Sequence, residues 1–259
     1  MEWIHHLTIS ETAFLLVLAR VSAFIAAIPI IGSNSVPVML RVLTAVSVSA
    51  VLFPVVTVPA PPSDMATLTV GLLGEALIGL VIGFGIRAIF AAVEFGSEMA
   101  GLQMGLGIGN LFDPVYSQQV SLVGQLQGLL ALVIFFAVNA HQIVLRALAE
   151  SFGRIPPLGF FLTGSLITQL IRLGGEIFLL AVMVSLPVTM VMLLAHMAVG
   201  ILMRVVPQMN VFLISFPVTI SLGLIVLGAS LPFVTGMLQG RIEGLGGDLR
   251  TLIVVMGRP

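Results

Sequence analysis

The sequence predicts an all-α integral membrane protein built from about six long apolar helices arranged in helical hairpins. Of its 259 residues, 59% are hydrophobic and only 8% are charged. Soluble domains carry about 25% charged residues, so most of this chain suits lipid better than water. Apolar runs of about 20 residues recur along it, and each is long enough to cross a bilayer as a helix.

Six membrane segments are expected in chain order: 12–31, 41–58, 65–99, 120–140, 177–203 and 211–238. The third exceeds the roughly 20 residues that a bilayer needs, so its end projects from the membrane or bends. The last two are separated only by Arg204–Asn210, which predicts a helical hairpin. Its turn contains Arg204, Pro207, Gln208 and Asn210.

Two further stretches are not expected to span the membrane. The segment at 160–171 is too short to cross with polar residues on both sides, and we expect it to be interfacial or re-entrant. The glycine-rich tail at 241–259 is expected to be loosely ordered.

Loop arginines predict the orientation of the six-span arrangement. Only Arg204 falls on one side of the membrane, so the positive-inside rule places both termini in the cytoplasm. If 160–171 spans, the N-terminal half inverts. The arginines on the other side are Arg146, Arg154, Arg172, Arg241, Arg250 and Arg258.

Charged residues inside the apolar segments need a reason, because an ionised group at mid-bilayer costs about 2.5–3.5 kcal/mol. Arg87, Glu94 and Glu98 fall within an arc of roughly 40° on a helix, which forms an intramembrane charged stripe. It either ties this helix to a neighbour through an Arg–Glu pair or lines a pore. Glu75, on another face, is expected to mark the point where the helix enters the membrane. Arg20 either reaches the interface or pairs with a carboxylate elsewhere.

The stretch EMAGLQMGLGIGNLFDPVYSQQ (98–119) interrupts the apolar pattern after the third segment. Its closely spaced glycines favour a mobile or tightly bent backbone, and Asp113-Pro114 stops any helix. This stretch is either an ordinary exposed loop or a functional element, and its residues alone leave both open. The glycines are Gly101, Gly105, Gly107 and Gly109.

Two glycine pairs have the small-residue spacing that lets membrane helices approach closely. They are Gly79-x-x-x-Gly83 and Gly101-x-x-x-Gly105. This spacing fits a protein that packs against other helices, either in its own chain or in a partner.

Several function classes are excluded by the residues. With no cysteine, the chain cannot form disulfides, thiolate metal sites or a cysteine nucleophile. A net charge of −1 excludes a broad basic surface for nucleic acid. The glycines at 105, 107 and 109 lack the dinucleotide-binding spacing, and no zinc-protease or serine-hydrolase motif occurs. We therefore expect no enzyme activity, no cofactor and no metal site, and favour a transport or structural role.

Four stretches carry a resemblance to a known family. They are RVSAFIAAIPIIGSNSVPVMLRV (20–42), EMAGLQMGLGIGNLFDP (98–114), FAVNAHQIVLRALAESF (136–152) and RVVPQMNVFLISFP (204–217). They cover nearly the whole chain in the family's order. On these motifs the sequence resembles the FliR family of flagellar type III export-gate proteins, which is homologous to the SctT family of injectisomes.

The resemblance implies a multi-pass protein of the bacterial inner membrane in the flagellar basal body. FliR-like proteins assemble with FliP and FliQ into the gate through which unfolded flagellar subunits leave the cytoplasm, with FlhB associated and FlhA nearby. A FliP-like part would cover 1–176 and a FliQ-like hairpin 177–240. The rival readings are the homologous subunit of a virulence injectisome and a small-solute transporter, which lacks support because no inverted repeat is obvious.

The glycine-rich loop, 105–119, corresponds by this resemblance to the family's plug, which projects into the channel and helps to close it. Glycines would let the loop move aside, and flexible methionine suits a seal against varied peptides. The residues expected to act in the plug are Met104, Gly105, Gly107, Gly109, Leu111, Phe112, Asp113 and Pro114.

Overall fold

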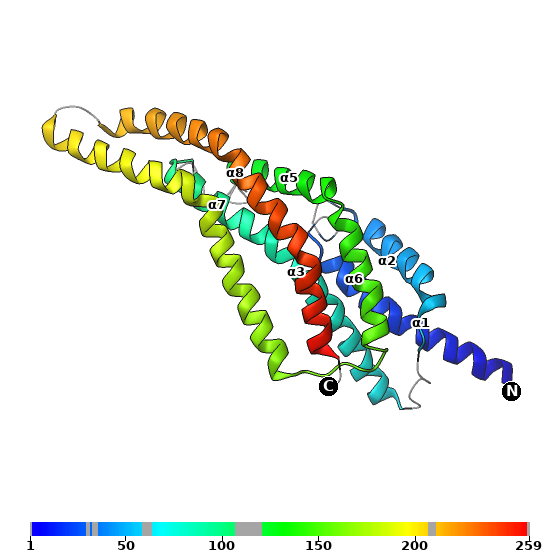
Figure 1. Cartoon of the computed structure of the whole chain (residues 1–259). Helices are drawn as coiled ribbons and strands as arrows, with labels where there is room; N and C mark the ends of the chain where they lie inside the picture. The colour runs from blue at the N-terminus through cyan, green and yellow to red at the C-terminus, as the bar shows by residue number, and fades with distance from the viewer. Residues whose placement is uncertain are drawn as a thin grey trace. The chain divides into compact units, whose positions relative to one another are not determined.

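The computed structural model describes residues 2–29, 32, 36–58, 64–106, 121–206 and 211–257, with backbone alone for 2–10 and 211–214. These residues form seven α-helices and one short 3-10 helix, with no strand among them, which confirms the predicted all-α fold. In chain order they are α1 (Glu2–Ala27), α2 (Val38–Leu52), η1 (Phe53–Val55), α3 (Met65–Gln103), α5 (Leu122–Ala137), α6 (Ala140–Arg154), α7 (Gly164–Val205) and α8 (Val211–Met256) (Figure 1).

The described residues include four helical stretches that are long and apolar enough to cross a membrane. They are 38–55, Met65–Gln103, Gly164–Val205 and Ser215–Met256. Helices α5 and α6, separated by Val138 and Asn139, form by length and composition either a fifth, broken span or a re-entrant loop. The chain is therefore a multi-pass membrane protein, and its described residues contain four candidate spans, or five if the α5–α6 pair counts as one.

The expectation that 160–171 is a separate interfacial segment is wrong, because α7 begins at Gly164 and runs unbroken through this region. Thr163 supplies the start signal: its hydroxyl oxygen accepts a hydrogen bond from the Leu166 N–H (3.3 Å). A threonine at this position satisfies a backbone donor that the first turn of a helix leaves free. The helix then has 42 residues, enough to cover both an interfacial and a spanning stretch.

The expectation of a loosely ordered tail is also wrong for 241–256, which continues α8 as regular helix. Buried apolar side chains recur there every three or four residues, which fixes one face of the helix in a core. Its glycines are tolerated because that face, rather than helix propensity, stabilises the segment. The buried residues are Leu245, Leu249, Leu252, Ile253 and Met256.

The chain divides into two compact units, and α3, α7 and α8 each contribute one end to each unit. The first unit comprises 1–88, 138–174 and 242–259. In it, α1 and α3 pack backbone to backbone: a Cβ at Gly79 would clash with the Arg20 carbonyl oxygen, and one at Gly83 would clash with the Ala27 Cβ. The small-residue spacing at Gly79 and Gly83 thus marks a close helix contact, as predicted.

The second unit comprises 89–137 and 175–241, and its α7 and α8 segments form the predicted antiparallel hairpin. Along the hairpin, the residue numbers of contacting pairs increase on α7 and decrease on α8. Glu176 pairs with Arg241 (Oε2–Nη2 2.5 Å) at one end. Nearer the turn, Ala181 packs in a cluster with Met237, and Met192 packs in another with Leu227.

Candidate functional site at the end of helix α3

Helix α3 ends in a Schellman motif at the point where the predicted plug begins. The Gly105 N–H donates to the Leu102 carbonyl and the Leu106 N–H donates to the Gly101 carbonyl, both at 3.0 Å. Gly105 has a φ of +87°, the left-handed conformation that this motif requires and that favours glycine. The sequence therefore uses Gly105 to terminate the helix in a defined geometry.

Met104 anchors this helix end in the apolar core of the second unit. Its side chain is fully buried among Val123, Val188, Met192 and Leu227. The methionine fits because α8 has a glycine opposite: a Cβ at Gly223 would clash with Met104 Cγ. In this structure Met104 holds the end of α3 in place, whereas its expected part in sealing a channel stays a prediction.

Two polar contacts fix the same helix end to the hairpin. The Thr219 hydroxyl of α8 lies 3.3 Å from the Met104 carbonyl and shares its proton with the Ser215 and Phe216 carbonyls of its own helix, at 3.0 and 3.2 Å. Gln103 Nε2 donates to Thr189 Oγ1 of α7 (3.1 Å). Beside these contacts, Ser97 Oγ donates to Gln127 Oε1 of α5 (2.7 Å), and both side chains are buried.

A cavity of about 350 Å³ adjoins this helix end, between it and the part of the hairpin nearest the turn. Apolar groups line much of it, and four polar side chains reach it. The apolar lining includes Leu102, Val199, Met203 and Phe216, and the polar side chains are Gln103, His196, Ser215 and Thr219.

Most of the predicted plug lies outside the residues that the structure describes. Gly107, Gly109, Leu111, Phe112, Asp113 and Pro114 fall there, as do Pro207, Gln208 and Asn210 of the hairpin turn. Arg204, which precedes that turn, is exposed. The described part thus gives the base of the predicted plug, from Gln103 to Leu106.

The charged stripe of α3 is exposed at all three positions. Arg87 belongs to the first unit, and Glu94 and Glu98 belong to the second. Within the part of the chain that the structure describes, none of the three forms a side-chain hydrogen bond or ion pair. The described chain therefore does not supply the Arg–Glu pair that would explain these charges.

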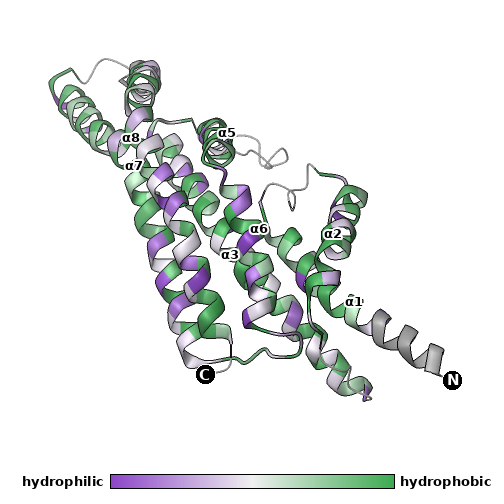
Figure 2. Cartoon of the chain, turned by 45° about the vertical axis from the view of Figure 1, so that its right-hand side comes forward, coloured by the Kyte–Doolittle hydropathy of each residue, from purple (hydrophilic) through white to green (hydrophobic). Residues whose placement is uncertain are grey.

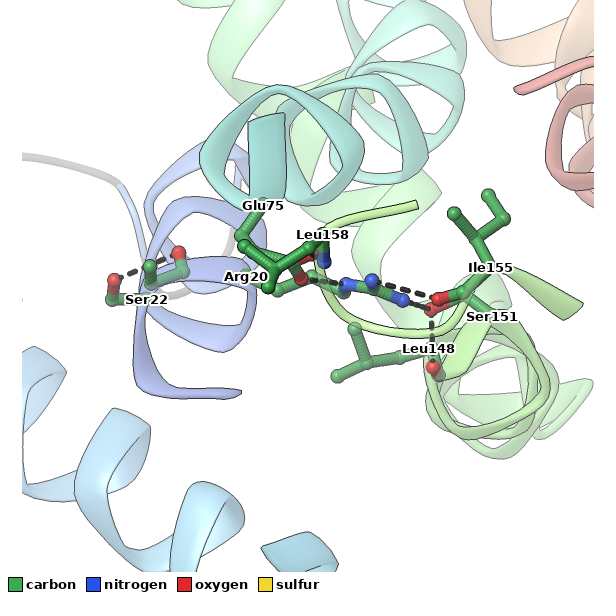
Figure 3. Close-up of polar contacts among 8 residues, drawn as sticks. Arg20, Ser22, Glu75, Leu148, Ser151, Ile155 and Leu158 are labelled. Atoms are coloured by element: carbon green, nitrogen blue, oxygen red, sulfur yellow. Dashed lines mark hydrogen bonds and ion pairs between the residues drawn. The ribbon is translucent and has the colours of Figure 1, made fainter. Parts of the chain in front are cut away.

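A buried charge network in the first unit explains Arg20 instead. Its Nε donates to Glu75 Oε2 (2.6 Å), Nη1 to Ser151 Oγ (3.1 Å) and Nη2 to the Ile155 carbonyl (2.9 Å) (Figure 3). The guanidinium also stacks over the Phe152 ring, 4.1 Å from its centroid. Arg20 thus pairs with a carboxylate, which is one of the two arrangements that the sequence allows.

Glu75, which was expected to mark the membrane entry of its helix, is the buried partner of Arg20, and its level in the membrane stays a prediction. Glu75 is fully buried, and its second oxygen accepts the Leu158 N–H (3.0 Å). The pair therefore joins α1 and α3 to residues 155–158, which connect α6 to α7. Sequence spacing gave no signal of this network, because Arg20 and Glu75 are 55 residues apart.

Large apolar surfaces remain uncovered by the residues that the structure describes. In α3 61% of the most apolar 18-residue window is buried, compared with 11% for the span that contains α2, 33% for α7 and 28% for α8. Hydrophobic residues predominate on α2 and along both helices of the hairpin near its turn (Figure 2). Lipid or other proteins must cover these surfaces, since monomeric soluble proteins rarely expose so large an apolar area.

Comparison with known proteins supplies the family. The family described as bacterial export proteins, family 1, matches residues 12–245. The chain is 31% identical over 258 residues to the flagellar biosynthetic protein FliR of Bacillus subtilis (strain 168), covering 95% of this chain and 96% of that protein. It is also 31% identical over 221 residues to the FliR of Escherichia coli (strain K12), covering 84% and 83%. The FliR of Pectobacterium carotovorum is 28% identical over 215 residues, covering 83% and 82%.

These matches extend over nearly all of the elements described above, from α1 into the last part of α8. They agree with the motifs at 20–42, 98–114, 136–152 and 204–217, and with a multi-pass α-helical membrane protein. The chain belongs to the FliR family of bacterial export proteins and is a component of flagellar biosynthesis.

Proposed function

We propose that this chain is a subunit of the flagellar type III protein export gate, which forms the channel entrance for unfolded flagellar subunits together with FliP and FliQ. The gate lies in the bacterial inner membrane, and FlhB and FlhA are its further neighbours. The observation that carries this proposal is the family match over residues 12–245. The FliR names of the relatives favour the flagellar gate over that of an injectisome.

The surface of the chain supports assembly with other membrane subunits. Glu94 and Glu98 are exposed on a helix that is otherwise apolar enough to span. Carboxylates at such positions require water or a polar protein partner rather than lipid. A subunit interface supplies the polar partner, and an aqueous channel supplies the water, so an export gate can satisfy this requirement.

Within the gate, we assign the plug to residues 105–119 and the FliQ-like hairpin to 177–240. The Schellman motif at Gly105 and the buried Met104 support this assignment, because a movable segment needs a fixed origin. The part at 1–176 is the FliP-like portion. The chain performs no catalysis in this proposal, and the export energy comes from outside the gate.

Co-purification tests the assembly. A tagged full-length chain expressed with FliP and FliQ should recover both proteins in detergent, and the same tagged chain should restore swimming to a strain lacking its own FliR. A chain carrying Gly79→Leu is the matched negative control, because that side chain cannot fit against the Arg20 carbonyl. Recovery of neither partner by the intact chain would contradict the proposal.

Reconstitution separates the gate from a small-solute transporter. The purified chain alone, in liposomes, should not move ions or metabolites down a gradient. Saturable transport of one solute by the chain alone would favour the transporter instead.

A further inference from the structure

The same tripeptide, Ser-Leu-Pro, occurs once inside each helix of the hairpin. Ser185-Leu186-Pro187 lies in α7 and Ser230-Leu231-Pro232 lies in α8. Proline inside a helix removes one backbone hydrogen bond and displaces the preceding turn, which is costly in a regular helix. Two such sites in one hairpin call for a structural explanation.

The two tripeptides lie at the same level of the hairpin. On one side of them, Ala181 of α7 and Met237 of α8 pack in a common cluster. On the other side, Met192 and Leu227 pack in a second common cluster. Toward the turn, Pro187 lies six residues after Ala181 on α7, and Pro232 lies five residues before Met237 on α8. The two prolines therefore lie at the same level of the antiparallel pair.

Each site weakens its helix in the same way. The prolines leave the carbonyls of Met183 and Gly228 without their usual N–H donors, because these residues lie four positions earlier. Each serine is buried and donates to the carbonyl three residues before it, Ser185 to Val182 (3.1 Å) and Ser230 to Leu227 (2.9 Å). Serine bonds of this kind bend helices slightly, and proline is the commonest cause of a kink. Both ribbons change direction partway along their length (Figure 1).

We propose that the paired Ser-Leu-Pro sites form a hinge across the hairpin. The arm beyond them, 188–205 with 211–229, moves as one piece because its two helices share the Met192 and Leu227 cluster. At Gly228 a Cβ would meet nothing within 4 Å, so there is open space beside the helix at this position. The hinge is a property of the hairpin and does not depend on the chain being a gate subunit.

The arm is connected to the end of α3. Thr219 and Gly223, both on the arm, contact the Met104 carbonyl and side chain. Bending at the hinge therefore displaces the Schellman motif at Gly105, whereas the part of the hairpin before the hinge is held by the Glu176–Arg241 pair.

Spin-label distances in the full-length chain in lipid nanodiscs test the hinge, and the absence of native cysteine makes each label unique. One pair, Leu179→Cys with Leu194→Cys, spans Pro187. The control pair, Met190→Cys with Val205→Cys, has the same 15-residue separation within the arm and contains no proline. All four positions are exposed.

The pair that spans Pro187 should give a broader distance distribution than the control pair. The double variant Pro187→Ala/Pro232→Ala should lose that excess width, whereas Pro217→Ala should retain it, since no proline of α7 faces Pro217. Equal widths for the two label pairs, or an excess width that survives the double substitution, would overturn the hinge.

Discussion

Replacing Arg20 with methionine removes the cationic partner of a completely buried carboxylate. Methionine has a comparable length and no charge, so the change isolates the guanidinium. It eliminates the 2.6 Å contact to Glu75 and the hydrogen bonds to Ser151 and the Ile155 carbonyl. Glu75 then retains only the Leu158 N–H as a hydrogen-bond donor among the described residues.

The expected loss is large because breaking a buried pair leaves an uncompensated charge. Removing one partner of such a pair typically destabilises a protein by about 3–5 kcal/mol. Replacing both partners removes the stranded charge, so Arg20→Met/Glu75→Met should be less destabilised than the sum of the single variants. The interaction energy from this double-mutant cycle should be well above roughly 0.5 kcal/mol, which is the deviation from additivity found for independent sites.

The chain offers an exposed pair in the same unit as a control. Arg250 and Glu150 are 3.3 Å apart with side chains 69% and 41% exposed. Exposed ion pairs contribute about 0–1 kcal/mol, so Arg250→Met should change the free energy of unfolding little. Denaturant titration of the detergent-solubilised chain, followed by helical circular dichroism, measures all the variants. An Arg20→Met effect no larger than that of Arg250→Met would refute the proposed role of the buried network.

Three further changes test the helix ends and contacts. Gly105→Ala should destabilise the chain by about 1–2 kcal/mol in the same titration, since an L side chain is strained at a φ of +87°. Gly79→Ala should cost about 1–3 kcal/mol through overpacking against the Arg20 carbonyl, whereas Gly200→Ala, which meets no neighbour, should be neutral or stabilising. Glu98→Ala should reduce the yield of the complex with FliP and FliQ more than it alters conductance if the charged stripe is structural; the reverse result would favour a pore-lining role.

Local sequence signals predicted the elements that depend on neighbouring residues. The hairpin followed from two apolar runs separated by a short polar turn, and α3 from its uninterrupted length. The close contact at Gly79 followed from small-residue spacing. In each case the relevant residues lie within a few turns of one another, where helical periodicity applies.

Features that depend on distant residues were missed. The partners of Arg20 lie 55 to 135 residues away, so periodicity could not connect them. The tail was misjudged because its glycines indicated disorder, while the packing of Leu245 and Leu249 in a core determined the helix. Gly223 gave no signal of its own, since its role is defined by Met104 on another helix.

Ion conductance of the assembled gate tests the central claim most directly. A chain lacking residues 107–119, which keeps Met104, Gly105 and Leu106 at the end of α3, should still assemble with FliP and FliQ. Planar-bilayer recordings should then show a leak that the intact complex lacks. Unchanged conductance in a fully assembled complex would contradict the assignment of this segment as the plug of an export gate.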